Sequence, residues 1–112
     1  MDINSEVANG VVVYRIAGRI DETARPKLES AVDSAINGGT PRILFDMRAV
    51  TYISSAGLRG ILSTAKRAIA VKGGLAIFGL RSTVNEVFET AGIQNFLPIA
   101  SDEIEARSRL GV

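Results

Sequence analysis

The chain contains neither cysteine nor histidine among its 112 residues. Without them it cannot form a disulfide, a Cys/His zinc site, a thiol nucleophile or an imidazole general base. For the same reason a Ser-His-Asp triad cannot be assembled from this chain alone. Lysine and carboxylate bases remain conceivable, but nothing pairs them at a useful spacing, and there is no glycine-rich phosphate loop. We therefore predict that the protein is not an enzyme and carries no cofactor and no metal.

Aromatic residues and unbalanced charge are also scarce. The chain has two tyrosines, four phenylalanines and no tryptophan, and its 13 basic and 12 acidic residues give a net charge of +1. These charges are interspersed, so nucleic-acid binding is not expected. No apolar run approaches the roughly 18 residues of a membrane span, and the N-terminus lacks the features of a secretory signal. We expect a cytoplasmic protein that does not bind membranes.

Length and pattern indicate one α/β domain covering residues 1–112. The dipeptide Asn9-Gly10 predicts a hairpin between residues 3–8 and the β-branched run 11–16, and Gly18 interrupts that run. After residue 40, strands alternate with helices, which is typical of mainly parallel strands joined by helical crossovers. We expect a mixed sheet of four to five strands with helices packed mainly on one face.

The expected elements after the hairpin follow from capping residues and apolar spacing. Asp21 or Thr23 can cap the first helix, and Thr83 with Glu86 has the spacing of a capping box for the third. The remaining boundaries come from Gly, Pro and the apolar runs. They predict a first helix ending at 37–39, strands at 42–47 and 75–78, a second helix from about 55 to 70, a short strand before 100 and a C-terminal helix over 102–110.

The most informative stretch is DMRAVTYISSAGLR, residues 46–59. It predicts a buried strand, a tight connection, and an amphipathic helix with the hydroxyls of Ser54 and Ser55 at its start. The first turn of a helix has unpaired N–H groups and the positive end of the dipole, so it is a favourable place for a phosphate. Serine is also a common N-cap, and position alone would favour simple capping.

The same stretch resembles the signature of the STAS domain found in bacterial anti-sigma factor antagonists. The resemblance extends over essentially the whole chain, including Gly18–Asp21, which is similar to the family's G-x-[LI]-D turn, and the segment 84–99. In those antagonists the serine two positions before the Gly-Leu pair is the phosphorylation site, which here is Ser55. Many members have Asp where this chain has Ser54, so Ser54 is a possible competing acceptor.

The resemblance implies a partner-switching cycle. The unphosphorylated protein would bind an anti-sigma factor that is a serine kinase of the histidine-kinase-like ATPase type. Phosphorylation of Ser55 would release the complex, and a metal-dependent Ser/Thr phosphatase would restore the starting form. ATP and Mg²⁺ would belong to the kinase.

Five residues are predicted to contact that partner, namely Asp21, Ser54, Ser55, Gly57 and Arg59. The family places the turn of Asp21 against the kinase, although a helix N-cap is an equally good reading of this residue. Arg59 follows Ser55 by one turn and is otherwise a solvated surface residue. Asp46 is interpreted as structural, at the end of a central strand.

A second functional class stays open. A STAS domain can act as an adaptor without sigma control, binding a transporter ATPase or another signalling partner, and such a protein need not be phosphorylated. A nucleotide-binding enzyme is disfavoured by the absent His, Cys and phosphate loop.

Overall fold

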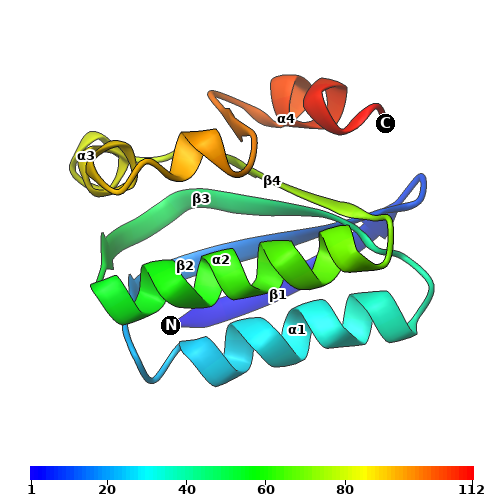
Figure 1. The fold of residues 1–112 in the computed structure, drawn as a ribbon, viewed down its shortest axis with the longest axis horizontal. Helices are drawn as coiled ribbons and strands as arrows, with labels where there is room; N and C mark the ends of the chain where they lie inside the picture. The colour runs from blue at the N-terminus through cyan, green and yellow to red at the C-terminus, as the bar shows by residue number, and fades with distance from the viewer.

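Five strands form one mixed sheet in the order β1-β2-β3-β4-β5 in the computed structural model of residues 1–112 (Figure 1). Only β1 and β2 pair antiparallel, and all other neighbours are parallel. The predicted mixed α/β sheet is confirmed. The elements in chain order are β1 (Asp2–Ala8), β2 (Val11–Ile20), α1 (Arg25–Asn37), β3 (Arg42–Ile53), α2 (Ser55–Ala70), β4 (Gly74–Phe78), α3 (Ser82–Thr90), the 3-10 helix η1 (Ile93–Asn95), β5 (Ile99–Ala100) and α4 (Glu103–Leu110).

The hairpin between β1 and β2 is closed by Asn9 and Gly10, as predicted. Both residues have positive φ, 54° and 78°, which is the backbone of a type I′ turn. Ala8 and Val11 are directly paired across the turn. Asparagine and glycine tolerate this conformation better than other residues, so the local sequence fixes the register of the first two strands.

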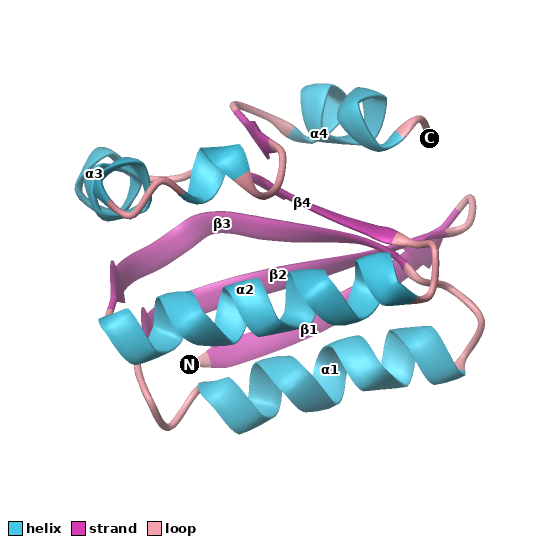
Figure 2. Cartoon of the chain, viewed as in Figure 1, coloured by secondary structure: helices cyan, strands magenta, loops and turns pink.

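The helices are distributed unequally over the two faces of the sheet. α1 and α2 lie along one face, and with α3 and η1 they enclose the larger core, which contains 23 buried residues (Figure 2). α4 covers part of the opposite face over a smaller cluster of seven residues. The central strands β3 and β4 are buried on both faces, which explains their continuous apolar runs. The prediction of helices mainly on one face is confirmed, with α4 as the exception.

Two predicted strand ends are wrong. β3 does not end at residue 47 but continues to Ile53, because it goes on pairing with β2 from Ala49 to Ile53 after a register shift. Asp46 therefore lies within a strand and not at its end. Gly18 does not end β2 either: its φ of +96° accompanies the irregularity in pairing, and the strand continues to Ile20.

Two predicted helix caps are also wrong. α1 begins at Arg25 behind Ala24, and no side chain caps it. The capping-box prediction fails because α3 begins at Ser82, so Thr83 lies inside the helix instead of preceding it. At the start of α1 and at the start of α3, the side chain predicted as the cap does not accept a hydrogen bond from the free N–H groups of the first turn. None of the four α-helices combines the length and apolar character needed to cross a bilayer.

Candidate functional site

Two turns meet at one corner of the molecule, at the C-terminal ends of β2 and β3 (Figure 1). Ile20 and Ile53 are paired at the last position of the two parallel strands, so the residues that follow them leave the sheet side by side. A backbone hydrogen bond of 2.9 Å from the N–H of Ser54 to the carbonyl of Ile20 joins the two turns directly. The structure therefore brings Asp21 and the Ser54-Ser55 pair, which are more than 30 residues apart in sequence, to one surface.

Gly57 makes the close packing behind this corner possible. A Cβ atom at this position would lie 2.5 Å from the carbonyl oxygen of Ile20 and 3.0 Å from side-chain atoms of both Ile20 and Ile53. Those distances leave no room for a side chain, so only glycine lets the first turn of α2 rest on the end of β2. Gly57 is one of the five residues predicted to contact the partner, but it is buried, so it supports the contact surface from behind and does not itself form part of it.

Ser54 and Ser55 differ in what their hydroxyls do. Ser54 is the N-cap of α2, in extended conformation, and its Oγ accepts a 3.0 Å hydrogen bond from the N–H of Gly57. Ser55 is the first residue of the helix, is exposed, and makes no side-chain hydrogen bond. The capping role that position alone would assign to either serine thus belongs to Ser54, and the hydroxyl of Ser55 is unengaged.

The helix that begins at Ser55 favours added negative charge at its first turn. The first turn of α2 contains no acidic residue, and the helix dipole places its positive end there. Arg59 is exposed one turn further along. A phosphate on Ser55 would meet the helix start and a cation on the same helix.

Asp21 is held by its own turn and does not cap α1. Its Oδ1 accepts hydrogen bonds from the hydroxyl of Thr23 at 2.6 Å and from the N–H of Thr23 at 3.0 Å. The hydroxyl bond is the main reason that the pKa of Asp21 lies below its usual range, and the nearby charge of Arg19 adds to the effect. The carboxylate is therefore ionised at neutral pH and fixed in orientation beside the serine turn.

A cation–π pair that was not predicted lies next to these turns. The guanidinium of Arg19 sits 4.0 Å from the ring centroid of Tyr52, and both side chains are exposed. The two residues are neighbours because they pair across β2 and β3 after the register shift. Nothing in the local sequence of either strand announces that pairing.

Asp46 belongs to a different environment in the middle of β3. Its side chain is only 7% exposed, and it accepts hydrogen bonds from the backbone and guanidinium of Arg48 and from Arg15. Burial opposes ionisation of this carboxyl, but the bonds from Arg48 and Arg15 outweigh it and lower the pKa to about 2. Arg15 also contacts Glu6 in β1 and Glu103 in α4. This set of contacts is structural, and sequence reasoning missed Arg15.

The surface around Ser55 contains no side chain that could activate the Ser55 hydroxyl as a nucleophile. No side chain lies within hydrogen-bond distance of the Ser55 hydroxyl to act as a base, and no three acidic residues come together in a way that could hold a metal ion. Every buried side-chain nitrogen and oxygen has a hydrogen-bond partner. The Ser55 hydroxyl is thus accessible and has no partner within the chain.

Comparison with known proteins identifies the family. The model of the STAS domain matches residues 2–106. The chain is 31% identical over 101 residues to BtrV of Bordetella bronchiseptica, which is named as a candidate anti-sigma factor antagonist, and the match covers 90% of this chain and 87% of BtrV.

Solved structures share the fold at lower identity. A candidate anti-sigma factor antagonist from Thermotoga maritima superposes with a TM-score of 0.89 at 18% identity, covering 98% of this chain and 95% of that one. The Bacillus protein SpoIIAA, solved in its phosphorylated form, gives a TM-score of 0.72 at 23% identity, covering 96% of this chain and 98% of that one. With a matched family model over nearly its entire length, the chain belongs to the STAS domain family.

Proposed function

We propose that the protein is an anti-sigma factor antagonist that works by partner switching and is switched by phosphorylation of Ser55. The observation that carries the proposal is the exposed, unengaged hydroxyl of Ser55 at the start of α2, next to a serine that already performs the capping. The similarity to BtrV supports the functional class. The protein acts as a substrate and binding partner and has no turnover of its own.

In this cycle the unphosphorylated protein binds an anti-sigma factor that is a serine kinase of the histidine-kinase-like ATPase type. The kinase transfers the γ-phosphoryl group of ATP to the Oγ of Ser55, a proton leaves the hydroxyl, and ADP is the leaving group. A metal-dependent Ser/Thr phosphatase then hydrolyses the ester. Both activities reside in the partners.

The bound surface comprises the two joined turns. Asp21 offers an ionised, oriented carboxylate, Ser54 and Ser55 form the adjoining turn, and Arg59 extends the surface along α2. Gly57 lies beneath this surface and lets the two turns approach. Because a backbone hydrogen bond joins the turns, a partner that covers one of them necessarily lies close to the other.

Added charge explains release without a change of fold. A phosphate brings about −1.5 to −2 charge to one exposed point. The protein itself can accommodate that charge at the helix start, but a partner packed on the same point would have to desolvate it. A penalty of roughly 2–4 kcal/mol lowers affinity about 30- to 1,000-fold, which is sufficient for a switch.

The test compares three forms of the full chain, namely wild type, Ser55→Ala and Ser55→Asp. Affinity purification followed by mass spectrometry identifies the partner, and titration calorimetry measures binding of each form to it. We expect Ser55→Asp to bind more weakly than the other two while keeping its melting temperature, since Asp is well accommodated at a helix start. Incubation of the wild type with the purified kinase and ATP should add one phosphate at Ser55.

Each alternative outcome has a distinct meaning. Phosphate on Ser54 would overturn the residue assignment. Equal affinity of all three forms, with no phosphorylation by a co-purifying kinase, would contradict the switch and favour a STAS adaptor that binds a transporter ATPase or another signalling partner.

A further inference from the structure

We propose that Arg59 is the built-in acceptor for the phosphate on Ser55, forming an ion pair within α2 that holds the phosphoryl group on the helix surface. The inference rests on the proposed function, because it concerns the phosphorylated form. It assigns to Arg59 an intramolecular contact, in addition to any contact with a partner.

Spacing places the two side chains together. Ser55 and Arg59 are four residues apart in one helix and both are exposed, so they neighbour each other on one face. The negative group would stand N-terminal to the positive one, which is the favourable order relative to the helix dipole. A phosphoserine side chain extends further than an aspartate side chain, and the flexible side chain of Arg59 can reach its phosphate from the next turn.

Arg59 is available for this contact, unlike the other arginines of the two packed helices. Arg25 is paired with Glu29 at 2.7 Å, and Arg67 is paired with Glu29 at 3.1 Å and Asp33 at 2.9 Å. No carboxylate lies within ion-pair distance of Arg59. Its guanidinium can therefore bind a phosphate without first giving up another partner.

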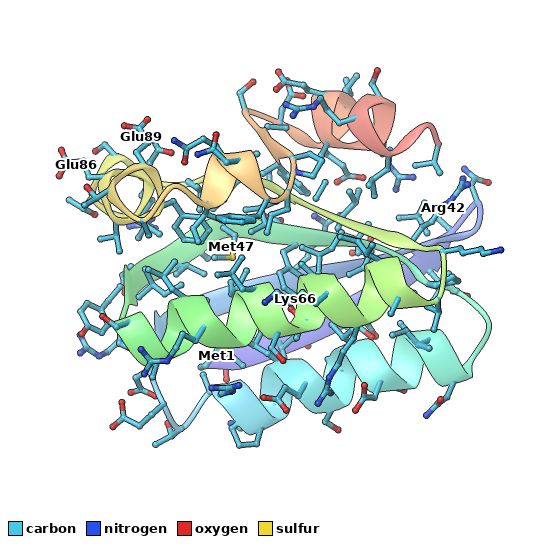
Figure 3. The ribbon with its side chains drawn as sticks, in the orientation of Figure 1. Met1, Arg42, Met47, Lys66, Glu86 and Glu89 are labelled. Carbon is cyan, nitrogen blue, oxygen red and sulfur yellow. The ribbon has the colours of Figure 1, made fainter.

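The groove that Arg59 lines contains no acidic side chain that could compete with the phosphate. A surface groove on the outer side of the helix pair is lined by Arg25, Arg59, Lys66 and Arg67 and by no acidic residue. Lys66 lies exposed in the C-terminal half of α2 (Figure 3), eleven positions beyond Ser55 and therefore about 16 Å further along the helix axis. Arg59 and Lys66 are the two cations of this groove without an ion pair, and only Arg59 is close enough to contact the phosphate.

The chemistry of the pair is favourable for a specific contact. The planar guanidinium presents parallel N–H donors that match two phosphate oxygens. The amides of Ser55 and Ala56 at the start of α2 have no intrahelical acceptor and can donate to the same group. These contacts form only after phosphorylation, so they should stabilise the phosphorylated helix and favour the doubly ionised phosphate.

The test uses protein made with phosphoserine at position 55 during synthesis, so that no kinase is required. Arg59→Gln removes the cation while keeping side-chain length and helix propensity. Lys66→Gln is the matched control, because it removes the same charge from the same helix at an exposed, unpaired position. Phosphorus NMR over a pH series reports the second pKa of the phosphate, and thermal melting is measured with and without the phosphate.

We expect the phosphate pKa to be lower in the wild type and in Lys66→Gln than in Arg59→Gln. Asp21 on the adjoining turn raises that pKa in all three proteins, and Arg19 and Arg25 lower it in all three, so the comparison isolates Arg59. Phosphorylation should raise the melting temperature by about 3 °C in the wild type, and most of this gain should disappear in Arg59→Gln. Equal pKa values and equal gains in both variants would overturn the inference.

Failure of this inference and failure of the proposed function can be told apart. The phosphate–arginine contact is measured on the isolated protein, whereas the switch is measured with the partner and ATP. A kinase that never modifies Ser55 would overturn the proposed function and leave the NMR result unchanged. A normal switch with no effect of Arg59→Gln on the phosphate would overturn only the inference.

Discussion

Asp46 and Ser55 lie nine positions apart in one stretch of sequence, yet the structure treats their polar groups in opposite ways. The carboxylate of Asp46 is 7% exposed and is bound by two arginines. The hydroxyl of Ser55 is exposed and bound by nothing. A polar group whose hydrogen bonds are all made inside the chain contributes to stability, whereas an accessible group without partners is free to interact with another molecule.

Substitution of Gly57 should have the largest effect on stability, because Gly57 lets the first turn of α2, with Ser55, pack on the end of β2. In Gly57→Ala the new Cβ would collide with the carbonyl of Ile20, a backbone atom that cannot swing away. We expect a loss of about 2–3 kcal/mol in the free energy of unfolding, measured by urea denaturation. Gly60→Ala is the control: its Cβ would lie 3.1 Å from the flexible Arg25 side chain, so stability should change by about 1 kcal/mol or less. Similar losses in both variants would refute the packing argument.

Removal of the Asp46 charge should cost stability and leave the functional corner intact. Asp46→Asn loses the ion pairs with Arg15 and Arg48, and the pKa of about 2 against an ordinary value of 3.8 corresponds to roughly 2 kcal/mol. Glu103→Gln removes a more exposed partner of Arg15 and should cost about 1 kcal/mol or less. If Asp46→Asn weakened partner binding at a temperature where it is fully folded, the contrast with Ser55 would be wrong.

The same carboxyl predicts how stability depends on pH. Because its pKa is lowered in the folded state, Asp46 stabilises the fold above its ordinary pKa, and that contribution is lost as the pH falls from about 4 through about 2. Wild type should therefore lose stability over this interval more steeply than Asp46→Asn. Urea denaturation of both proteins at a series of acidic pH values checks the difference, and parallel curves would contradict it.

Loss of the helix cap should have a moderate effect that separates the two serines. Ser54→Ala removes the oxygen that accepts from the N–H of Gly57, and we expect a loss of about 1 kcal/mol in the free energy of unfolding. Ser55→Ala removes a hydroxyl without partners and raises helix propensity, so stability should be unchanged or slightly higher. Thermal melting of the two variants side by side measures this, and the reverse order would exchange the roles of the serines.

Asp21→Asn should have the smallest effect on stability and tests whether its turn is recognised. Asparagine retains an oxygen that can accept from the N–H and hydroxyl of Thr23, so the melting temperature should stay constant. If the ionised carboxylate contacts the kinase, single-turnover phosphorylation should slow by roughly 3- to 10-fold. Glu22→Gln, an exposed neighbour on the same turn, is the charge-matched control. Wild-type rates in Asp21→Asn would confine recognition to the serine turn and α2.

Local sequence was sufficient for the features that depend on neighbouring residues. The Asn9-Gly10 turn, the three longer helices and the central strands follow from turn chemistry and apolar spacing, and the structure confirms them. The length of β3 could not be obtained in this way. Most residues after Met47 are exposed and break the buried apolar run, and they remain in a strand because β2 pairs with them beyond a register shift.

The polar contacts depended even more on distant pairing. Arg15 meets Asp46 because they are register partners on adjacent strands, and Glu103 joins them from a helix almost 90 positions away in sequence. The cap predicted at Asp21 is absent because its carboxylate accepts from Thr23 within the preceding turn, and α1 begins only at Arg25. The position of the serine pair could be predicted from the sequence, whereas which serine caps α2 and which has a free hydroxyl depends on how the backbone enters the helix.

The hydrogen bond between Ser54 and Ile20 has a consequence for the speed of response. It couples the loop of Asp21 to the start of α2, while Gly57 leaves no slack between the helix and the strand end. A modification at Ser55 would thus act on a surface that does not need to rearrange first. The delay between signal and output would then be set by how fast partners dissociate and how fast phosphate is added or removed. Both rates depend on the partners and not on a rearrangement of this domain.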